Sequence, residues 1–143
     1  MTDQLPSTPR FLEMKSQRAD YGPQLEILVA YIYNHVVRPG SFVVDGGANA
    51  GLHAGPLTRL VAPGGHVVCF EPAPRSVAAL RRNLAAAIEA GIAEARQQAL
   101  GHAAGTMQFT VNTRNSALSR LAVAGDVLKD DQERIDVEVV TLD

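Results

Sequence analysis

A short apolar segment, SFVVDG at residues 41–46, leads into a cluster of small and polar residues that begins at Asp45. The residues of this cluster that could serve a ligand are Asp45, Gly46, Gly47, Asn49 and Gly51. Small residues let the backbone turn sharply and approach a ligand closely. The free N–H groups at the start of a following helix would point toward the same space. This pattern predicts a ligand-binding turn between a strand and a helix.

A second carboxylate, Glu71, follows Gly51 by twenty residues and ends the apolar run HVVCFE at residues 66–71. In dinucleotide-binding folds, an acidic side chain at this distance accepts hydrogen bonds from the ribose hydroxyls. The glycine turn and the acidic strand end together predict a site for a nucleoside-containing cofactor.

The spacing of the glycines discriminates between cofactors. A dinucleotide fingerprint has glycine at its first, third and sixth places, which here hold Gly46, Ala48 and Gly51. The middle glycine is missing, and this disfavours a nicotinamide-dependent oxidoreductase. Counted from Asp45, the pattern is Asp-x-Gly-x-Asn-x-Gly. That form resembles the first motif of class I methyltransferases, which bind S-adenosylmethionine.

The elements that must position these residues alternate along the chain. Helices are predicted over 25–36, over 50–61 and from Pro74 to a cap at Gly91, and buried strands over 41–46 and 66–71. The position of residues 92–100 in this series indicates a third strand. Alternating strands and helices require right-handed crossovers and form a parallel sheet with helices on its faces. The segments 106–111 and 135–142 alternate apolar and polar residues, as half-exposed antiparallel strands do.

The predicted fold class is therefore α/β: a Rossmann-like open parallel sheet with flanking helices and a C-terminal antiparallel strand pair. We expect residues 1–20 to form a loose arm, with a short helical stretch around residues 11–14. Residues 21–143 are expected to form the domain that holds the cofactor.

A series of sequence blocks narrows the resemblance. These blocks are VVDGGANAGLH, PGGHVVCFEPAP, RRNLAAA, ALGHAAGTMQF and VEVVTLD. In order and spacing they resemble the FkbM-like methyltransferase family over roughly residues 20–143. The resemblance implies transfer of a methyl group from S-adenosylmethionine to a hydroxyl of a small molecule or sugar.

The same resemblance implies a role for each matching residue. Asp45, Gly47, Asn49 and Gly51 would line the methionine end of the cofactor, Glu71 would hold the ribose, and Pro72 would shape the turn beside it. Three residues would lie near the adenine: Ala99, Leu100 and Gly101. With Gly46, these are the ten predicted cofactor-binding residues. No catalytic base is identified.

Two features depart from the family pattern. Gly55 and Pro56 fall inside the predicted helix 50–61, where an interior proline costs about 3 kcal/mol, so this helix is expected to start late or to bend. The family pattern also continues beyond the VEVVTLD block, so the chain resembles the N-terminal half of the domain. The 41–46 strand would then be a sheet edge. We expect self-association through it, a second chain completing the sheet, or the C-terminal strand folding onto it.

Composition excludes several classes. The chain has 143 residues, the size of one domain, and 13 basic against 15 acidic residues give a net charge of −2. A nearly neutral chain has no field for gathering nucleic acid or an anionic membrane. The sequence has no signal-peptide pattern and no apolar run of membrane-spanning length. Cys69 is the single cysteine, expected in the core, and no metal-ligand spacing occurs. A cytoplasmic location is expected.

One alternative from another class stays open beside the methyltransferase. The chain could be a non-catalytic nucleoside-binding module that keeps the cofactor site without the chemistry. The family resemblance implies that Asn115, Ser116 and Ser119 could reach a substrate, but we interpret them as a plain polar loop.

Overall fold

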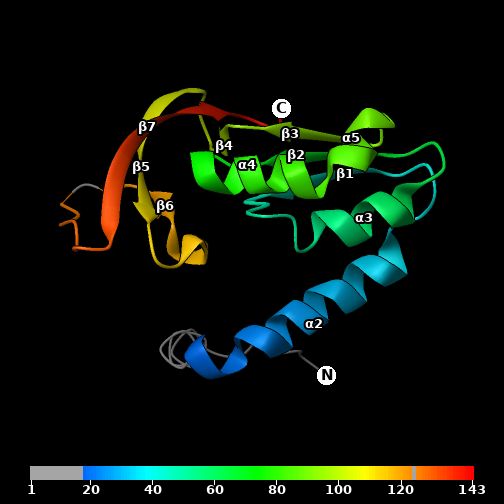
Figure 1. Cartoon of the computed structure of the whole chain (residues 1–143), viewed down its shortest axis with the longest axis horizontal. Coiled ribbons are helices and arrows are strands. Elements are labelled where there is room, and N and C mark those ends of the chain that lie inside the picture. Colours follow the sequence, from blue (N-terminus) through cyan, green and yellow to red (C-terminus); the bar gives the residue numbers. More distant parts are fainter. Residues whose placement is uncertain (1–17, 124) are drawn as a thin grey trace, which may run out of the picture. The chain divides into compact units, whose positions relative to one another are not determined.

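The computed structural model describes the backbone of residues 18–123 and 125–143, and the side chains of these residues from 25 onward. The chain divides into two compact units, Met1–Val36 and Val37–Asp143. In the first unit, helix α2 spans Arg18–Val36 (Figure 1). The helix ends where predicted, but it begins before Pro23.

The predicted arm is therefore wrong for residues 18–20, which are helical. Pro23 lies inside the helix, where it removes one backbone hydrogen bond without ending it. Arg18 and Ala19 are good helix formers, which favours the earlier start. The rest of the predicted arm, including the stretch around residues 11–14, lies outside the described residues.

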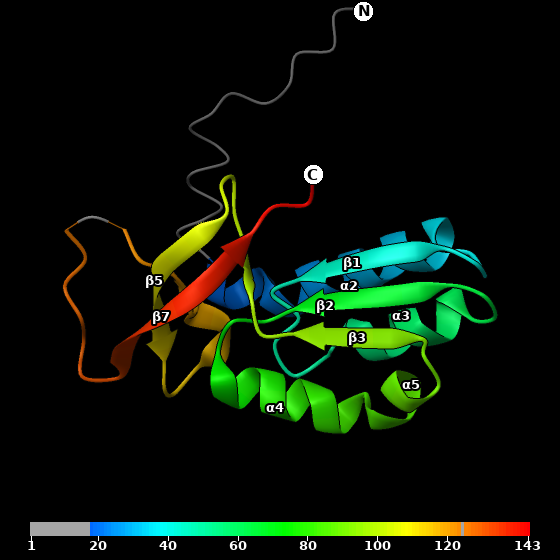
Figure 2. The same ribbon diagram turned by 90° about the horizontal axis from the view of Figure 1, so that it is seen from above.

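The second unit contains the predicted parallel sheet. Its strands β1 (Phe42–Gly46), β2 (His66–Phe70) and β3 (Ala93–Arg96) lie in the order β1-β2-β3. Both strand pairs are parallel. The connections carry helices α3 (Ala54–Val61), α4 (Pro74–Asn83) and α5 (Ala85–Glu89). Figure 2 shows these three strands side by side at one end of the second unit, with strands β5 (Gly105–Asn112) and β7 (Gln132–Val140) at the opposite end. The α/β class is confirmed.

Burial differs sharply between the neighbouring strands. In β2, the residues Val67–Phe70 are all buried, and burial raises the pKa of the Cys69 thiol to about 12. Cys69 is a core residue, as predicted. In β1, by contrast, Phe42 is 70% exposed and Val44 is 38% exposed. The prediction of a buried β1 is wrong. The expectation that this strand is a sheet edge is confirmed, because in the described residues β1 pairs with β2 alone.

Helix α3 begins at Ala54 and not near Ala50. Pro56 is its third residue, in the first turn, where a helix leaves its N–H groups without intrahelical partners in any case. The missing proline N–H therefore costs little. The expectation that this helix starts late is confirmed.

The long helix predicted from Pro74 is interrupted at Leu84, whose backbone angles are φ −101° and ψ 10°. The Asn83 amide donates a hydrogen bond to the Ala50 carbonyl at 2.8 Å, which fixes the end of α4 to the glycine turn. At the end of α5, Gly91 has φ 71° and its N–H contacts the Ile88 carbonyl. The predicted cap at Gly91 is confirmed.

The second sheet contains β4 (Ala99–Leu100), β5 (Gly105–Asn112), β6 (Arg120–Leu121) and β7 (Gln132–Val140), in the order β4-β7-β5-β6. The predicted antiparallel pair is confirmed in β5 and β7. The predicted strand 92–100 is divided, because β4 leaves the first sheet and pairs in parallel with β7. Since β7 pairs with β4 and β5, the expectation that it covers β1 is wrong. A single-turn helix, η1 (Ser116–Leu118), lies between β5 and β6.

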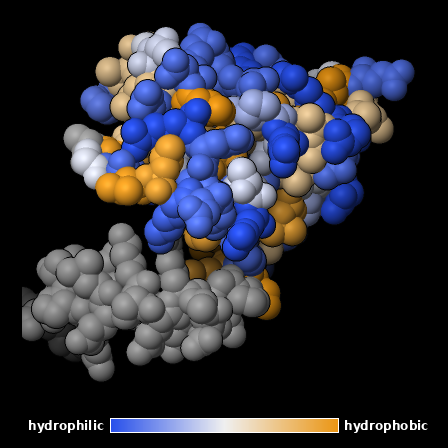
Figure 3. Space-filling model, turned by 60° about the vertical axis from the view of Figure 1, so that its left-hand side comes forward, coloured by the Kyte–Doolittle hydropathy of each residue, from blue (hydrophilic) through white to orange (hydrophobic). Residues whose placement is uncertain are grey.

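The core of the second sheet is a compact apolar cluster: Ala73, Ala99, Phe109, Val111, Val137 and Val139. Figure 3 shows one face of the molecule, on which hydrophilic side chains (blue) predominate and apolar ones (orange) form separate groups. None of the described helices is both long and apolar enough to cross a membrane. Within the same residues, no group of His, Cys, Asp and Glu side chains could hold a metal ion.

Candidate functional site

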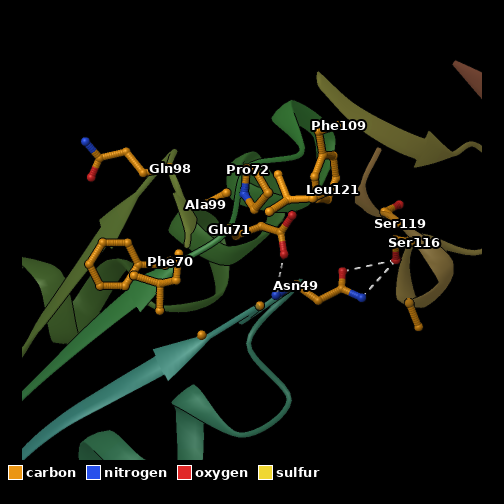
Figure 4. Close-up of a pocket in the computed structure, with 14 residues that line it drawn as sticks. Asn49, Phe70, Glu71, Pro72, Gln98, Ala99, Phe109, Ser116, Ser119 and Leu121 are labelled. Atoms are coloured by element: carbon orange, nitrogen blue, oxygen red, sulfur yellow. Dashed lines mark hydrogen bonds between the residues drawn. The ribbon is translucent and has the colours of Figure 1, made fainter. Parts of the chain in front are cut away.

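A pocket of about 460 Å³ lies where the carboxyl ends of β1 and β2 meet the second sheet (Figure 4). Its walls come from both sheets and from η1. The lining residues are Gly46, Gly47, Asn49, Phe70, Glu71, Pro72, Gln98, Ala99, Leu100, Phe109, Ser116, Ala117, Ser119 and Leu121. The volume is in the range of small-molecule sites, which are roughly 300–1,000 Å³.

The structure brings seven of the ten predicted residues together around this pocket: Gly46, Gly47, Asn49, Glu71, Pro72, Ala99 and Leu100. The other three, Asp45, Gly51 and Gly101, do not line it. The glycine turn and the acidic strand end, which are far apart in sequence, therefore face one cavity.

The glycine turn is held by backbone contacts with β2. The N–H groups of Gly47 and Ala48 both donate to the Phe70 carbonyl, at 2.9 and 3.0 Å. Gly47 has φ 77°, and Asn49 has φ 49°, which is uncommon outside glycine. A Cβ placed on Gly47 would meet no atom within 4 Å. Glycine is thus needed at this position for its backbone angle, and the space beside it stays open.

Glu71 fixes the same turn from the next strand. Its Oε2 accepts a hydrogen bond from the Asn49 N–H at 2.9 Å, and its Oε1 accepts one from the Ala73 N–H at 2.8 Å. The side chain is only 6% exposed. Burial raises the pKa of this carboxyl, the two backbone N–H groups lower it, and the Asp45 charge raises it. Each carboxylate oxygen has further acceptor capacity, which a ligand hydroxyl could use.

Asn49 connects the glycine turn to η1. Its Nδ2 donates to Ser116 Oγ at 2.9 Å, and the Ser116 hydroxyl donates to Asn49 Oδ1 at 3.1 Å (Figure 4). The loop carrying Ser116 is itself braced, since Asn112 Oδ1 accepts from the Arg114 and Asn115 N–H groups. The amide predicted to serve a ligand is therefore engaged with a side chain 67 positions away.

Asp45 lies one residue before the pocket lining and has an unusual environment. Its Oδ2 is buried and finds no hydrogen-bond partner within the described part of the chain. Burial raises the pKa of this carboxyl, and the charge of His53 lowers it. Buried polar atoms without a partner are rare, so this oxygen marks an unusual environment directly before the glycine turn.

Gly51 and Gly101 serve packing. A Cβ on Gly51 would lie 3.0 Å from Leu80 Cδ1, and one on Gly101 would lie 2.6 Å from Val139 Cγ1. Both glycines therefore allow close approach of neighbouring elements. That role explains their absence from the pocket wall.

Sequence reasoning missed half of the pocket lining: Phe70, Gln98, Phe109, Ser116, Ala117, Ser119 and Leu121. Ser116 and Ser119 both line the cavity, so the interpretation as a plain polar loop is wrong for them and the weaker alternative, a contact with a ligand, fits their position. A local signal exists in Asn115, whose side chain accepts a hydrogen bond from the Ala117 N–H and caps η1. The apolar members lie on strand ends, whose position depends on the pairing of the two sheets.

Comparison with solved structures finds partial similarity to methyltransferases. An S-adenosylmethionine-dependent O-methyltransferase from Thermotoga maritima matches with 20% identity and a TM-score of 0.44, over 53% of this chain and 28% of that one. A protein-L-isoaspartate O-methyltransferase matches with 22% identity and a TM-score of 0.43, over 52% and 22%. A methyltransferase from Geobacter sulfurreducens matches with 18% identity and a TM-score of 0.43, over 68% and 53%.

The matched part of this chain thus spans about half or less of the length of those proteins. No family model matches the chain, and no curated protein matches it.

Proposed function

We propose that this chain binds S-adenosylmethionine in the pocket between its two sheets, as the cofactor-binding part of a methyltransferase that acts on a hydroxyl. One observation carries the proposal: the Gly46–Gly47 turn after β1 and Glu71 after β2 line the same cavity. In open α/β sheets, ligands bind beyond the carboxyl ends of the strands.

The residues around the pocket fit the parts of this cofactor. Glu71 has acceptor capacity left for ribose hydroxyls. Pro72, Ala99 and Leu100 offer an apolar wall for a flat adenine ring. The open backbone at Gly47 suits the polar end of the cofactor. Asp45 does not line the pocket, so its carboxylate can favour the positive charge there only through its own charge, without a direct contact.

When bound, S-adenosylmethionine supplies a methyl group on a positively charged sulfur. The contribution of this chain is to bind and orient. A pocket that holds cofactor and acceptor side by side favours the reaction by proximity. Glu71 is the one ionisable side chain in the described lining, and both of its oxygens already accept backbone hydrogen bonds. We therefore assign it to binding and not to proton removal.

The proposed class of methyl acceptor is based on the resemblance of the sequence blocks to FkbM-like methyltransferases. This resemblance supports transfer to a hydroxyl of a small molecule or sugar, and we propose that class of acceptor.

Titration calorimetry tests the cofactor. We expect S-adenosylmethionine and its demethylated product to bind in preference to NAD, because Ala48 occupies the place of the middle glycine of a dinucleotide fingerprint. Glu89→Gln, at an exposed carboxylate at the end of α5, is a control and should bind like the native chain. Tighter binding of NAD would contradict the proposal.

A non-catalytic nucleoside-binding module is the second candidate. The pocket lining favours it, since Glu71 is the one ionisable group among the described lining residues and is fixed by backbone hydrogen bonds. Incubation with labelled S-adenosylmethionine and a panel of hydroxylated acceptors separates the two candidates. Cofactor binding without transfer to any acceptor would favour the module.

A further inference from the structure

A second pocket, of about 280 Å³, adjoins the first. Asn49 and Ser116 line both cavities, so ligands in them would lie next to each other. We propose that the second pocket binds the phosphate group of a hydroxylated small molecule and is the subsite that holds the acceptor. The assignment to an acceptor rests on the proposed function, whereas phosphate binding does not.

Two arginines line this second pocket from elements far apart in sequence. Arg75 lies in the first turn of α4, and Arg114 lies in the loop between β5 and η1. Both are exposed, and neither guanidinium forms an ion pair with another described residue. Guanidinium groups bind phosphate oxygens through pairs of charge-assisted hydrogen bonds. Two of them around one cavity provide the charge that a phosphate monoester needs.

Ser76 adds a hydroxyl to the same pocket. The residue as a whole is only 7% exposed and lines the cavity. A hydroxyl at this position can donate a hydrogen bond to a ligand oxygen. The N-cap residue of α4, Ala73, provides no side-chain cap, and its own N–H already donates to Glu71. Pro74 has no N–H, so Arg75 and Ser76 supply the first-turn N–H groups that would favour a further anion there.

Glu133 defines the rest of the ligand. Its carboxylate lines the same pocket, so the ionisable lining of two arginines and one glutamate has a formal charge of 2 − 1 = +1. A carboxylate repels free phosphate but accepts hydrogen bonds from hydroxyl groups. The combination therefore selects a molecule that carries both a phosphate and hydroxyls, such as a sugar phosphate.

Titration calorimetry with glucose 6-phosphate, glucose and inorganic phosphate tests the proposal. We expect glucose 6-phosphate to bind most tightly. Arg75→Gln and Arg114→Gln should each weaken it about tenfold or more, as expected when charge-assisted hydrogen bonds are lost. Arg82→Gln is the matched control, because Arg82 is an exposed arginine of the same helix that does not line the pocket. It should leave the affinity unchanged.

Binding of S-adenosylhomocysteine to the same variants is measured separately. An affinity unchanged by either substitution, together with weakened glucose 6-phosphate binding, supports the subsite. Loss of cofactor binding instead would place the arginines at the cofactor and overturn the proposal. So would equal binding of glucose or inorganic phosphate, or no effect of either substitution. If the native chain binds glucose 6-phosphate but not the cofactor, the proposed function fails while the phosphate site remains.

Discussion

Glu71 stabilises the fold as well as offering acceptors to a ligand. Replacing it with alanine leaves the N–H groups of Asn49 and Ala73 without their present acceptor. We expect Glu71→Ala to lower the free energy of unfolding by about 2–3 kcal/mol and to weaken cofactor binding by about 1.5–3 kcal/mol. Urea denaturation measures the first effect and calorimetry the second.

The control for this variant is Glu89→Ala, at an exposed carboxylate at the end of α5. It should change the free energy of unfolding by less than about 0.5 kcal/mol. A Glu71→Ala chain as stable as the native one would show that the two hydrogen bonds do not hold the glycine turn.

Asp45 gives the chain a distinctive pH dependence. Burial raises the pKa of its carboxyl above the ordinary value of 3.8, so the folded state binds a proton more readily than the unfolded state. The favourable contribution is complete below 3.8 and is lost as the pH rises through the folded pKa. Asp45→Asn removes the ionisable group, so the variant does not lose this stability as the pH rises. At neutral pH we expect the variant to be more stable than the native chain by about 1 kcal/mol.

Urea denaturation of both chains over a pH series measures this effect. The difference between the chains is the relevant quantity, because it cancels other groups such as Asp126, whose pKa Arg120 lowers to about 2. This difference should be near zero in acid and grow as the pH rises. A difference independent of pH would contradict the assigned burial effect.

At the scale of elements, local patterns predicted what depends on local chemistry. The apolar run of β2, the alternation in β5 and β7 and the Gly91 cap all lie where the sequence indicated them. For β1 the apolar run predicted a buried strand, whereas the resemblance to an N-terminal half of a domain predicted a sheet edge. The run alone could not decide between them, because it does not show how many neighbours a strand has. The end of α4 depends on a contact between Asn83 and Ala50, which is set by the tertiary structure.

The site divides in the same way. The glycine turn and Glu71 are recognisable from spacing, because the backbone geometry of a strand–turn–helix unit fixes them. The wall formed by the second sheet is not, since Ser116 reaches Asn49 across 67 positions of sequence. Its position follows from strand pairing, which no local pattern specifies.

Gly65 joins three elements at the other end of the parallel sheet. A Cβ on this residue would overlap the Ser41 and Val61 carbonyl oxygens, and these are backbone atoms that can shift only at a cost. We expect Gly65→Ala to lower the free energy of unfolding by about 3 kcal/mol, the upper end of the range for overpacking. Thermal or urea denaturation measures the change.

Gly64→Ala is the neighbouring control. Gly64 has φ 84° with open space around it, so alanine there adds backbone strain alone, about 1 kcal/mol. Equal losses in the two variants would show that steric overlap at Gly65 is relieved by a small shift of the chain.

At the scale of the whole molecule, the feature that predicts association is the edge of β1, which has no second strand partner among the described residues. The edge strand has exposed apolar side chains at Phe42 and Val44 and no proline or lysine to block pairing. We expect chains to associate through it as the concentration rises. Phe42→Lys should abolish this association, which light scattering measures as a fall to the mass of one chain.

Leu142→Lys is the control, because Leu142 is similarly exposed, at 67% against 70% for Phe42, but lies outside β1. It should leave the association unchanged. A native chain that stays monomeric, with rapid amide exchange at Phe42–Val44, would contradict the expectation.

The pocket at the seam between the two sheets has a consequence for cooperativity. Backbone hydrogen bonds join β1, β2 and β3 into one sheet and β4, β7, β5 and β6 into another. In native-state hydrogen exchange, separate sheets of this kind open partly independently of each other. A ligand that contacts Gly47 in the turn after β1 and Leu121 in the second sheet binds only when both sheets are folded, and it therefore couples their opening. Cofactor binding should then slow amide exchange as far away as Gln132, which lies at the start of β7, whereas β4 pairs with the other end of that strand.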